Sequence, residues 1–498
     1  MRRALSGILA AALVLGIGEL LAAVVGPDSS PFVAVGSAAV DNTPSGVREW
    51  AIGTFGTSDK LALFIGMGVV ILALAAAAGV LERPKRPIGS ALFVVLGILG
   101  VLAAMTRSGS GAVAALPTIV AVAVGILVLR SLVDRAEPVA GEGFSRRKFV
   151  TLAGISAAAA VATGAAGRVL GASTRAVTQD RAAFTVPVPD SPAPPVPASA
   201  DLRLPGLSPY VTSNTDFYRI DTALVVPRVN SGDWSLRIHG MVDNEMTLTL
   251  ADLEKRVSIE RMVTLTCVSN PIGGDLIGNA TWTGYSLKDI LAEARPQSSA
   301  DMVLSSSYDD FTAGTPLDVL MDGRDAMLAV AMNGEPLPIE HGYPARLVVP
   351  GLYGYVSATK WVTDLEVTKF SQARAYWTDR GWSERGPIKT ACRIDTPAGS
   401  KDVDAGTVMI AGVAWAQHRG ISRVEVRIDN GDWAEATLSD EYSRDTWRQW
   451  SYAWEATSGQ HRIEARATDS TGEVQTDVRV DTVPDGASGY ASMPANVR

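Results

Sequence analysis

Five long apolar runs constrain this chain more than any other feature of its sequence. They lie at about 4–26, 61–81, 88–105, 113–134 and 149–171. Each is close to the roughly 20 residues that a helix needs to cross the hydrocarbon of a bilayer. The runs at 61–81 and 117–129 contain no charged residue, which argues against buried helices of a water-soluble domain. The sequence therefore predicts an all-α transmembrane bundle of five spans, with a four-helix region at 1–135 and a basic segment plus the fifth helix at 136–175.

Basic residues between the runs predict the orientation of the bundle, because Lys and Arg are retained on the cytoplasmic side. Three basic clusters alternate with the spans: Arg2 and Arg3; Arg83, Lys85 and Arg86; and Arg130, Arg135, Arg146, Arg147 and Lys148. With all three clusters inside, an odd number of spans sends everything after residue 171 outward. We expect a multi-pass protein of the plasma membrane, with the lipid bilayer as a partner and the C-terminal part on the extracytoplasmic side.

The start of the fifth span resembles a twin-arginine export signal. Ser145-Arg146-Arg147-Lys148-Phe149-Val150 precedes a modestly hydrophobic stretch rich in Ala and Gly. An ordinary basic membrane anchor is the alternative. Twin-arginine export carries folded proteins, often with a cofactor already inserted, so this interpretation predicts a cofactor in the exported part.

Charge and residue counts exclude several partners and cofactors. The formal net charge of -8 argues against a nucleic-acid partner, because phosphate binding needs a basic surface. Two cysteines are too few for a four-cysteine iron–sulfur cluster. No apolar run contains a histidine, the usual axial ligand of a transmembrane haem; the four are His239, His341, His418 and His461. We therefore expect no iron–sulfur cluster and no haem. The bundle is interpreted as an anchor or docking platform, with electron carriage through a bound quinone or partner subunit as the alternative.

The residues after the fifth span divide by pattern. Proline spacing at 176–205 predicts an extended, polyproline-like linker. Short strand patterns with few helices, chiefly Ser286 to Ala294 and Pro316 to Met321, predict an α+β domain at 206–384. An alternating, strand-only pattern with an Asn430-Gly431 hairpin turn predicts an all-β immunoglobulin-like sandwich at 385–484. Residues 485–498 are expected to form a C-terminal tail.

Cys267 is the first candidate for chemistry. It lies where a predicted strand runs into a loop rich in Gly and Pro. Three interpretations remain open from the residues alone: a small buried hydrophobic residue, a disulfide with Cys392, or an accessible thiolate suited to a soft metal.

A set of motifs downstream is more specific. It comprises Trp282-Thr283-Gly284-Tyr285, Met332-Asn333-Gly334-Glu335-Pro336, His341-Gly342-Tyr343-Pro344-Ala345-Arg346 and Lys360-Trp361. Together with the Cys267 segment, these motifs resemble the sulfite oxidase family of molybdopterin enzymes, over about residues 206 to 484. The resemblance, together with the membrane spans and the twin-arginine-like motif, implies a membrane-anchored bacterial type of this family.

The resemblance implies a role for each matching residue. Cys267 is the expected catalytic residue and the protein ligand to molybdenum in a molybdenum–molybdopterin cofactor. The expected pterin-binding residues are Asn214, Phe217, Tyr218, Asp309, His341, Arg346, Ala358, Thr359 and Lys360. The planar guanidinium of an arginine and the charged ammonium of a lysine can both bind the phosphate group of a pterin. The 385–484 region resembles the family's dimerisation domain and leaves a homodimer open.

One departure from the family pattern affects the substrate. Sulfite oxidases bind their oxyanion with several arginines and a tyrosine, whereas here Thr281 precedes Trp282 and Trp382 stands at the tyrosine position. The remaining candidates are Arg219, Arg374 and Arg380. We expect oxygen-atom transfer to or from a small substrate that is sulfoxide- or N-oxide-like or sulfite-like, and the departure favours a neutral or bulkier substrate over sulfite. The electrons then pass to or from a separate carrier. The alternative is a non-catalytic, membrane-anchored binding or structural protein on a degenerate scaffold, which should have lost Cys267 or Arg346.

Overall fold

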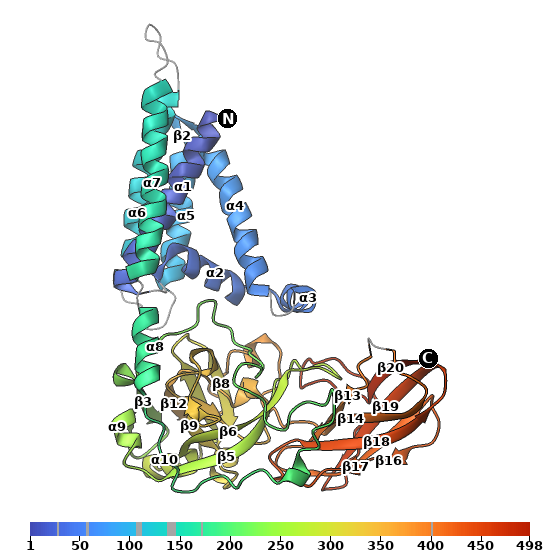
Figure 1. The fold of residues 1–498 in the computed structure, drawn as a ribbon. Helices are drawn as coiled ribbons and strands as arrows, with labels where there is room; N and C mark the ends of the chain where they lie inside the picture. The colour runs from blue at the N-terminus through green and yellow to red at the C-terminus, as the bar shows by residue number, and fades with distance from the viewer. Residues whose placement is uncertain (27–28, 56–58, 106–111, 137–145, 171–172, 400–401) are drawn as a thin grey trace. The chain divides into compact units, whose positions relative to one another are not determined.

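The computed structural model of the chain forms two compact units, residues 1–176 with 223–226 and residues 177–222 with 227–498. The structure describes residues 1–26, 29–55, 59–105, 112–136, 146–170, 173–399 and 402–498 (Figure 1).

The first unit is helical. Five of its helices are long and apolar enough to cross a membrane, as the sequence predicts. They are α1 (Arg2–Val25), α4 (Asp59–Leu81), α5 (Ile88–Met105), α6 (Leu116–Ala136) and α7 (Arg146–Leu170). Helix α1 packs against α4, α6 and α7, so it lies inside the group (Figure 1).

Glycines allow α1 and α4 to pack with their backbones in contact. A Cβ atom on Gly7 would lie 1.9 Å from the carbonyl oxygen of Ala75, and one on Gly79 would lie 1.9 Å from that of Arg3. Small residues at such positions are the usual means by which helices associate in lipid, where burial of apolar surface gives little driving force.

The connections in this unit contain short elements. The expected loop between the first two spans forms α2 (Pro31–Asp41) and α3 (Ser45–Phe55). A turn with β1 (Glu82–Arg83) and β2 (Arg86–Pro87) joins α4 to α5, and the 3-10 helix η3 (Ala112–Ala115) leads into α6. Ser145 of the predicted twin-arginine motif lies outside the described residues. Arg146 and Arg147 begin α7, but their side chains are also outside the described part.

The segment predicted as a Pro-rich linker, 176–205, is extended over its Pro-rich part and packs on the second unit. Helix α8 (Ser173–Ala183) enters it, and from Val177 onward the segment belongs to the second unit. The backbone N–H of Ser191 donates to the carbonyl of Ser258, and the Tyr442 hydroxyl donates to the carbonyl of Pro194. Because a Pro-rich extended chain has no internal hydrogen bonds, packing on neighbouring strands satisfies its backbone groups.

The region expected to be α+β contains two five-stranded sheets. One has the order β10-β9-β6-β5 with β11 also paired to β9, and the other has the order β4-β3-β12-β7-β8. Neighbouring strands are antiparallel except β3 and β12. The strands are β3 (Ser235–Gly240), β4 (Met246–Thr249), β5 (Ser258–Thr266), β6 (Ile277–Ser286), β7 (Met302–Ser307), β8 (Thr312–Pro316), β9 (Met327–Met332), β10 (Glu335–Pro336), β11 (Arg346–Val348) and β12 (Val362–Thr368).

Few helices accompany these sheets. They are α9 (Leu250–Leu253), α10 (Leu287–Ala294) and α11 (Leu317–Met321), with short 3-10 helices η4 (Ala198–Ala200), η5 (Ser231–Asp233), η6 (Ile339–His341), η7 (Gly354–Val356) and η8 (Thr378–Arg380). The Ser286 hydroxyl accepts a hydrogen bond from the backbone N–H of Asp289 and so caps α10. The two predicted helical stretches are confirmed.

The C-terminal region is the predicted all-β sandwich of two four-stranded antiparallel sheets, β13-β14-β18-β17 and β16-β15-β19-β20. Its strands are β13 (Ala391–Thr396), β14 (Gly406–Trp415), β15 (Ile421–Ile428), β16 (Ala434–Glu435), β17 (Thr437–Leu438), β18 (Arg448–Ala456), β19 (Gly459–Asp469) and β20 (Ala491–Val497). The hairpin at Asn430, which has a φ of 59°, is confirmed between β15 and β16. The expected tail at 485–498 is wrong, because β20 lies within it and pairs with β19.

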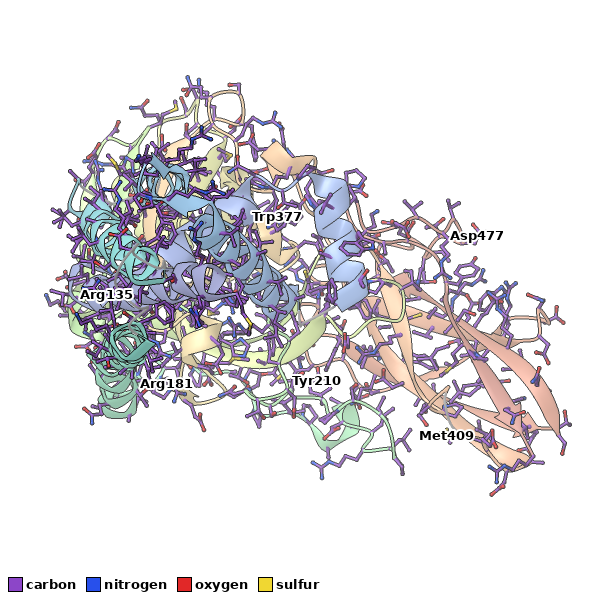
Figure 2. The ribbon with its side chains drawn as sticks, turned by 90° about the horizontal axis from the view of Figure 1, so that it is seen from above. Arg135, Arg181, Tyr210, Trp377, Met409 and Asp477 are labelled. Carbon is purple, nitrogen blue, oxygen red and sulfur yellow. The ribbon has the colours of Figure 1, made fainter. Side chains whose placement is uncertain are left out.

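The two parts of the second unit share a continuous core that positions Cys267. The Trp447 indole N–H donates over 2.9 Å to the carbonyl of Tyr210, which is labelled in Figure 2, and the Gln417 amide donates to the carbonyl of Thr264 over 3.0 Å. The same Gln417 amide donates to the Thr266 hydroxyl. Thr266 is the last residue of β5, so the sandwich domain holds the strand end directly before Cys267.

Candidate active site

A cavity in the second unit brings most of the predicted site residues together. The space between its walls, part of which is open to solvent, is about 850 Å³. The predicted residues that line it are Phe217, Tyr218, Cys267, Asp309, His341, Arg346, Ala358 and Lys360. Asn214 and Thr359 do not line the cavity. They pack behind it, where the Asn214 carbonyl lies 3.3 Å from Nε2 of His341 and the Thr359 hydroxyl bonds that of Ser305.

Cys267 is a free, buried thiol at the end of β5. Its backbone N–H donates to the carbonyl of Leu276, and its carbonyl accepts from Asn270, which fixes the tight loop after the strand. Burial raises the pKa of the thiol, although hydrogen bonds with Ser269 act in the opposite direction. Cys392, on β13, is also free and buried, so the alternative of a Cys267–Cys392 disulfide is not what the structure contains.

Arg346 is a buried cation that lines the same cavity. It begins β11, and its guanidinium donates to the carbonyls of His341 and Ala358 over 3.2 and 3.4 Å. Its Cζ lies 5.0 Å from the centroid of the Trp282 ring. Burial lowers the pKa of Arg346 to about 10. Within the described part of the chain, no carboxylate forms an ion pair with it.

Lys360 differs from Arg346 because it has a counter-charge. Its Nζ lies 2.8 Å from Oδ2 of Asp221 and donates to the carbonyl of Glu340. Burial lowers the pKa of Lys360 to about 8, and Asp221 acts in the opposite direction. Asp221 also pairs with Arg219, whose Nε lies 2.8 Å from the same oxygen.

His341 and its neighbour Gly342 shape the wall between these cations. Burial, together with the nearby Arg346 and Lys360, lowers the pKa of His341 to about 4, so the ring is neutral at pH 7. Gly342 has a φ of 112°, and a Cβ there would lie 3.0 Å from Cβ of Arg346 and 3.1 Å from Cβ of Lys360. A glycine is therefore required for the two basic side chains to emerge this close together.

Asp309 contributes a carboxyl group to the cavity. It accepts a hydrogen bond from the Ser307 hydroxyl at the end of β7. Burial, and to a smaller extent the negative charge of Asp221, raise the pKa of Asp309. The carboxyl can therefore hold a proton nearer to neutral pH than an exposed aspartate can.

Aromatic side chains and few cations form the remaining wall. Phe311, Tyr355, Trp377 and Trp382 line the cavity, with Trp377 labelled in Figure 2. The arginines considered for substrate binding have other partners and do not line it: Arg219 pairs with Asp221, Arg374 pairs with Asp379, and Arg380 lies over the Tyr376 ring.

Sequence reasoning missed Asp221 and the supporting rings Trp282 and Trp361. Asp221 follows the noted Arg219 by two residues, but nothing in that spacing indicates a lysine 139 residues away as its partner. Trp282 opens the motif Trp282-Thr283-Gly284-Tyr285. Its position under Arg346, however, depends on the pairing of β6 with β9 and of β9 with β11.

The side chains present fit a molybdenum–molybdopterin group. Among the described residues, no cluster of three or more His, Cys, Asp or Glu side chains could hold a metal ion, so a metal beside Cys267 needs ligands from outside the protein. A pterin dithiolene supplies such ligands. An anionic pterin also supplies the counter-charge that Arg346 lacks, and an unpaired buried cation is otherwise costly.

Comparison with known proteins agrees with this site. Residues 223–377 match the family model described as the oxidoreductase molybdopterin binding domain, and residues 391–486 match that of a bacterial Ig domain. Mitochondrial sulfite oxidase of Rattus norvegicus is 29% identical over 319 residues, covering 54% of this chain and 58% of that protein. The chain thus spans little more than half the length of this relative.

Two further proteins extend the comparison. The uncharacterized oxidoreductase YuiH of Bacillus subtilis is 33% identical over 153 residues, 31% of this chain and 74% of that protein. The solved structure of the sulfane dehydrogenase SoxCD from Paracoccus pantotrophus shares the fold, with a TM-score of 0.50 and 22% identity over 58% of this chain and 84% of that one. The chain therefore belongs to the sulfite oxidase family of molybdopterin-dependent oxidoreductases.

Proposed function

We propose that this protein is a membrane-anchored molybdenum oxidoreductase that transfers an oxygen atom to or from a small substrate on the extracytoplasmic side. The observation that carries the proposal is the cavity lined by both Cys267 and Arg346, a buried thiol and a buried cation that lacks an ion-pair partner among the described residues. A molybdenum–molybdopterin group bound there supplies two-electron oxygen-atom transfer.

Different side chains in the cavity bind different parts of that group. Cys267 ligates the metal as a thiolate, because a bound cation favours the deprotonated sulfur that burial alone disfavours. Arg346 and Lys360 bind the anionic pterin from the adjoining wall. Neutral His341 donates or accepts a hydrogen bond without adding charge, and Asn214 orients it through the backbone.

In this proposal, Asp309 donates and accepts the protons of the reaction. Reduction of a sulfoxide or N-oxide releases its oxygen as water and consumes two protons, and the reverse reaction returns them. A carboxyl group with a raised pKa in the cavity wall can donate or accept a proton at Oδ during either direction.

A neutral substrate suits the open part of the cavity. Its wall there is aromatic, from Phe311, Trp377 and Trp382. Arg219 and Arg374 already pair with carboxylates, and in this proposal the pterin takes up the charge of Arg346. We propose a sulfoxide or N-oxide rather than sulfite, whose charge would require a free cation. The two electrons come from or go to a separate carrier, and the five apolar helices keep the enzyme at the bilayer.

Metal and pterin analysis of the full-length protein tests the proposal, with Cys267→Ala and Cys392→Ala as matched variants. We expect near-stoichiometric molybdenum and pterin in the parent and in Cys392→Ala. Cys267→Ala should lose oxygen transfer and show an altered molybdenum EPR signal. A screen with sulfoxides, N-oxides and sulfite then identifies the substrate class. Absence of molybdenum and pterin after expression in a cofactor-competent host would overturn the enzyme assignment in favour of a binding protein.

A further inference from the structure

Helix α8 contacts the loop that leads into β11, residues 335–345, which we name the 335–345 loop. Four residues, at the end of α8 and directly after it, make this contact: Val177, Asp180, Arg181 and Phe184. They are three or four positions apart in the sequence, a spacing that places side chains on the same side of a helix. From Val177 onward, α8 belongs to the same compact unit as the loop.

Arg181 holds the beginning of the 335–345 loop through two adjacent carbonyls. Its Nε donates to the carbonyl of Leu337 over 2.7 Å, and its Nη2 donates to that of Pro336 over 2.6 Å. The Glu335 carboxylate lies 3.5 Å from the same Nη2 (Arg181 is labelled in Figure 2). Because a guanidinium is planar and its donors have fixed directions, the two bonds together fix the course of the backbone.

Asp180 holds the other end of the same loop through Tyr343. The Tyr343 hydroxyl donates to Oδ2 of Asp180 over 2.7 Å. Ser231 holds this carboxylate in place, since its backbone N–H and its hydroxyl donate to it over 2.7 and 2.8 Å. The Tyr343 ring is buried, and the Phe184 ring packs edge-on against it with 5.8 Å between centroids. Tyr343 is only two residues after His341, so these contacts restrain the backbone next to a cavity residue.

Side chains at the cavity hold the middle of the loop. They donate to three successive carbonyls: Trp361 to Ile339 over 2.8 Å, Lys360 to Glu340 over 3.0 Å, and Arg346 to His341 over 3.2 Å. The loop is thus held between α8 and the residues expected to bind the pterin. A loop that is ordered before a ligand arrives binds it more tightly, because the ordering does not have to be paid for on binding.

We propose that Arg181 and Asp180 are positioning residues of the active site, which fix the 335–345 loop so that His341 and Arg346 are placed to bind the pterin. This inference rests on the proposed function, because it takes His341 and Arg346 as pterin-binding residues. Contacts that only attached α8 to the domain would leave the cofactor unchanged when they were removed. Contacts that position the loop predict a change at the cofactor as well.

Hydrogen–deuterium exchange of the full-length apoprotein, made in a cofactor-deficient host, measures how firmly the loop is held. We expect Arg181→Met to increase exchange in peptides that cover residues 341–343, whose amides donate within the loop. Tyr343→Phe should also increase it, but should add nothing in an Asp180→Ala background, because both changes remove the same hydrogen bond. Arg237→Met, which breaks an exposed ion pair of β3, should leave exchange in these peptides unchanged.

Pterin content and the molybdenum EPR signal, after expression in a cofactor-competent host, measure the effect on the site. Arg181→Met should retain about 3- to 10-fold less pterin and show an altered signal. Tyr343→Phe removes a single oxygen atom and should change both in the same direction, which keeps the test decisive if Arg181→Met does not fold. Val424→Ala, in the core of the C-terminal sandwich, lowers stability elsewhere and should change neither.

The outcomes separate this inference from the proposed function. Absence of pterin from the parent protein would overturn both. Pterin in the parent, with unchanged content and EPR signal in Arg181→Met and Tyr343→Phe, would overturn the positioning role alone, even if loop exchange increased. Unchanged loop exchange in both variants would overturn it as well.

Discussion

Lys360 Nζ lies 2.8 Å from Asp221 Oδ2, and both side chains are almost completely buried in the wall of the cavity that contains Cys267. Arg346, in the same wall, has no such carboxylate among the described residues. Asp221 neutralises the charge of Lys360, whereas the charge of Arg346 remains available to a bound anion. This difference leads to opposite expectations for changes at the two positions.

Replacing Asp221 with Asn leaves Lys360 as a second unpaired buried cation. We expect the apoprotein, made in a cofactor-deficient host, to lose about 3–5 kcal/mol of stability, since removing one partner of a buried pair has this cost. Calorimetry of the full-length apoprotein measures the change as a lower Tm. Asp216→Asn, at an exposed position of the same segment, should leave Tm unchanged. Equal Tm values in both variants would contradict the importance of the pair.

Replacing Arg346 with Met removes the unpaired cation while keeping an apolar stem of similar length. We expect the apoprotein to be as stable as the parent or more so, because a buried charge without a partner is lost. Pterin retained after purification should fall at least about tenfold, the equivalent of roughly 1.4 kcal/mol. Pterin analysis and calorimetry on the same samples measure both effects. A less stable apoprotein with unchanged pterin content would indicate that Arg346 has only a structural role.

Acid should destabilise the site through His341. Its pKa is about 4 in the fold and 6.5 ordinarily, so between these values the unfolded chain binds more protons than the folded chain. Stability therefore rises with pH from 4 to 6.5 and is lost as pH falls through this window, by about 3 kcal/mol in total. Thermal unfolding between pH 4 and 7 measures the slope. His341→Gln, which cannot titrate, should have a shallower slope; an identical slope would assign the acid sensitivity to other groups.

Substituting Gly342 with Ala tests the close approach of Arg346 and Lys360. The left-handed backbone costs about 1–2 kcal/mol for any residue with a Cβ, and the collision with both side chains adds about 1–3 kcal/mol. Gly381→Ala is the matched control, because its φ is 91° and a Cβ there has nothing within 4 Å. Calorimetry should show a larger fall in Tm for Gly342→Ala, accompanied by loss of pterin. The same fall in both variants would mean that only backbone strain matters.

Much of the architecture could be predicted because it depends on local pattern. A membrane-spanning helix can be recognised from one continuous run of apolar residues, without knowledge of any distant partner, as α4 illustrates. Alternating residues and the Asn430-Gly431 turn predict the β15–β16 hairpin for the same reason. The packing of the proline-rich segment near Ser258 and the pairing of β20 with β19 could not be predicted, because the backbone partners are distant in sequence.

The sequence by itself determined the apolar spans, the order of the domains and the residue types available for a molybdopterin site, because each of these is a property of neighbouring residues. Only the tertiary structure decided which charges are paired. Asp221 reaches Lys360 across 139 positions, and Trp282 lies under Arg346 through the pairing of β6, β9 and β11. Burial and charge pairing depend on contacts between distant segments, and these contacts leave the buried Arg346 without a carboxylate partner among the described residues.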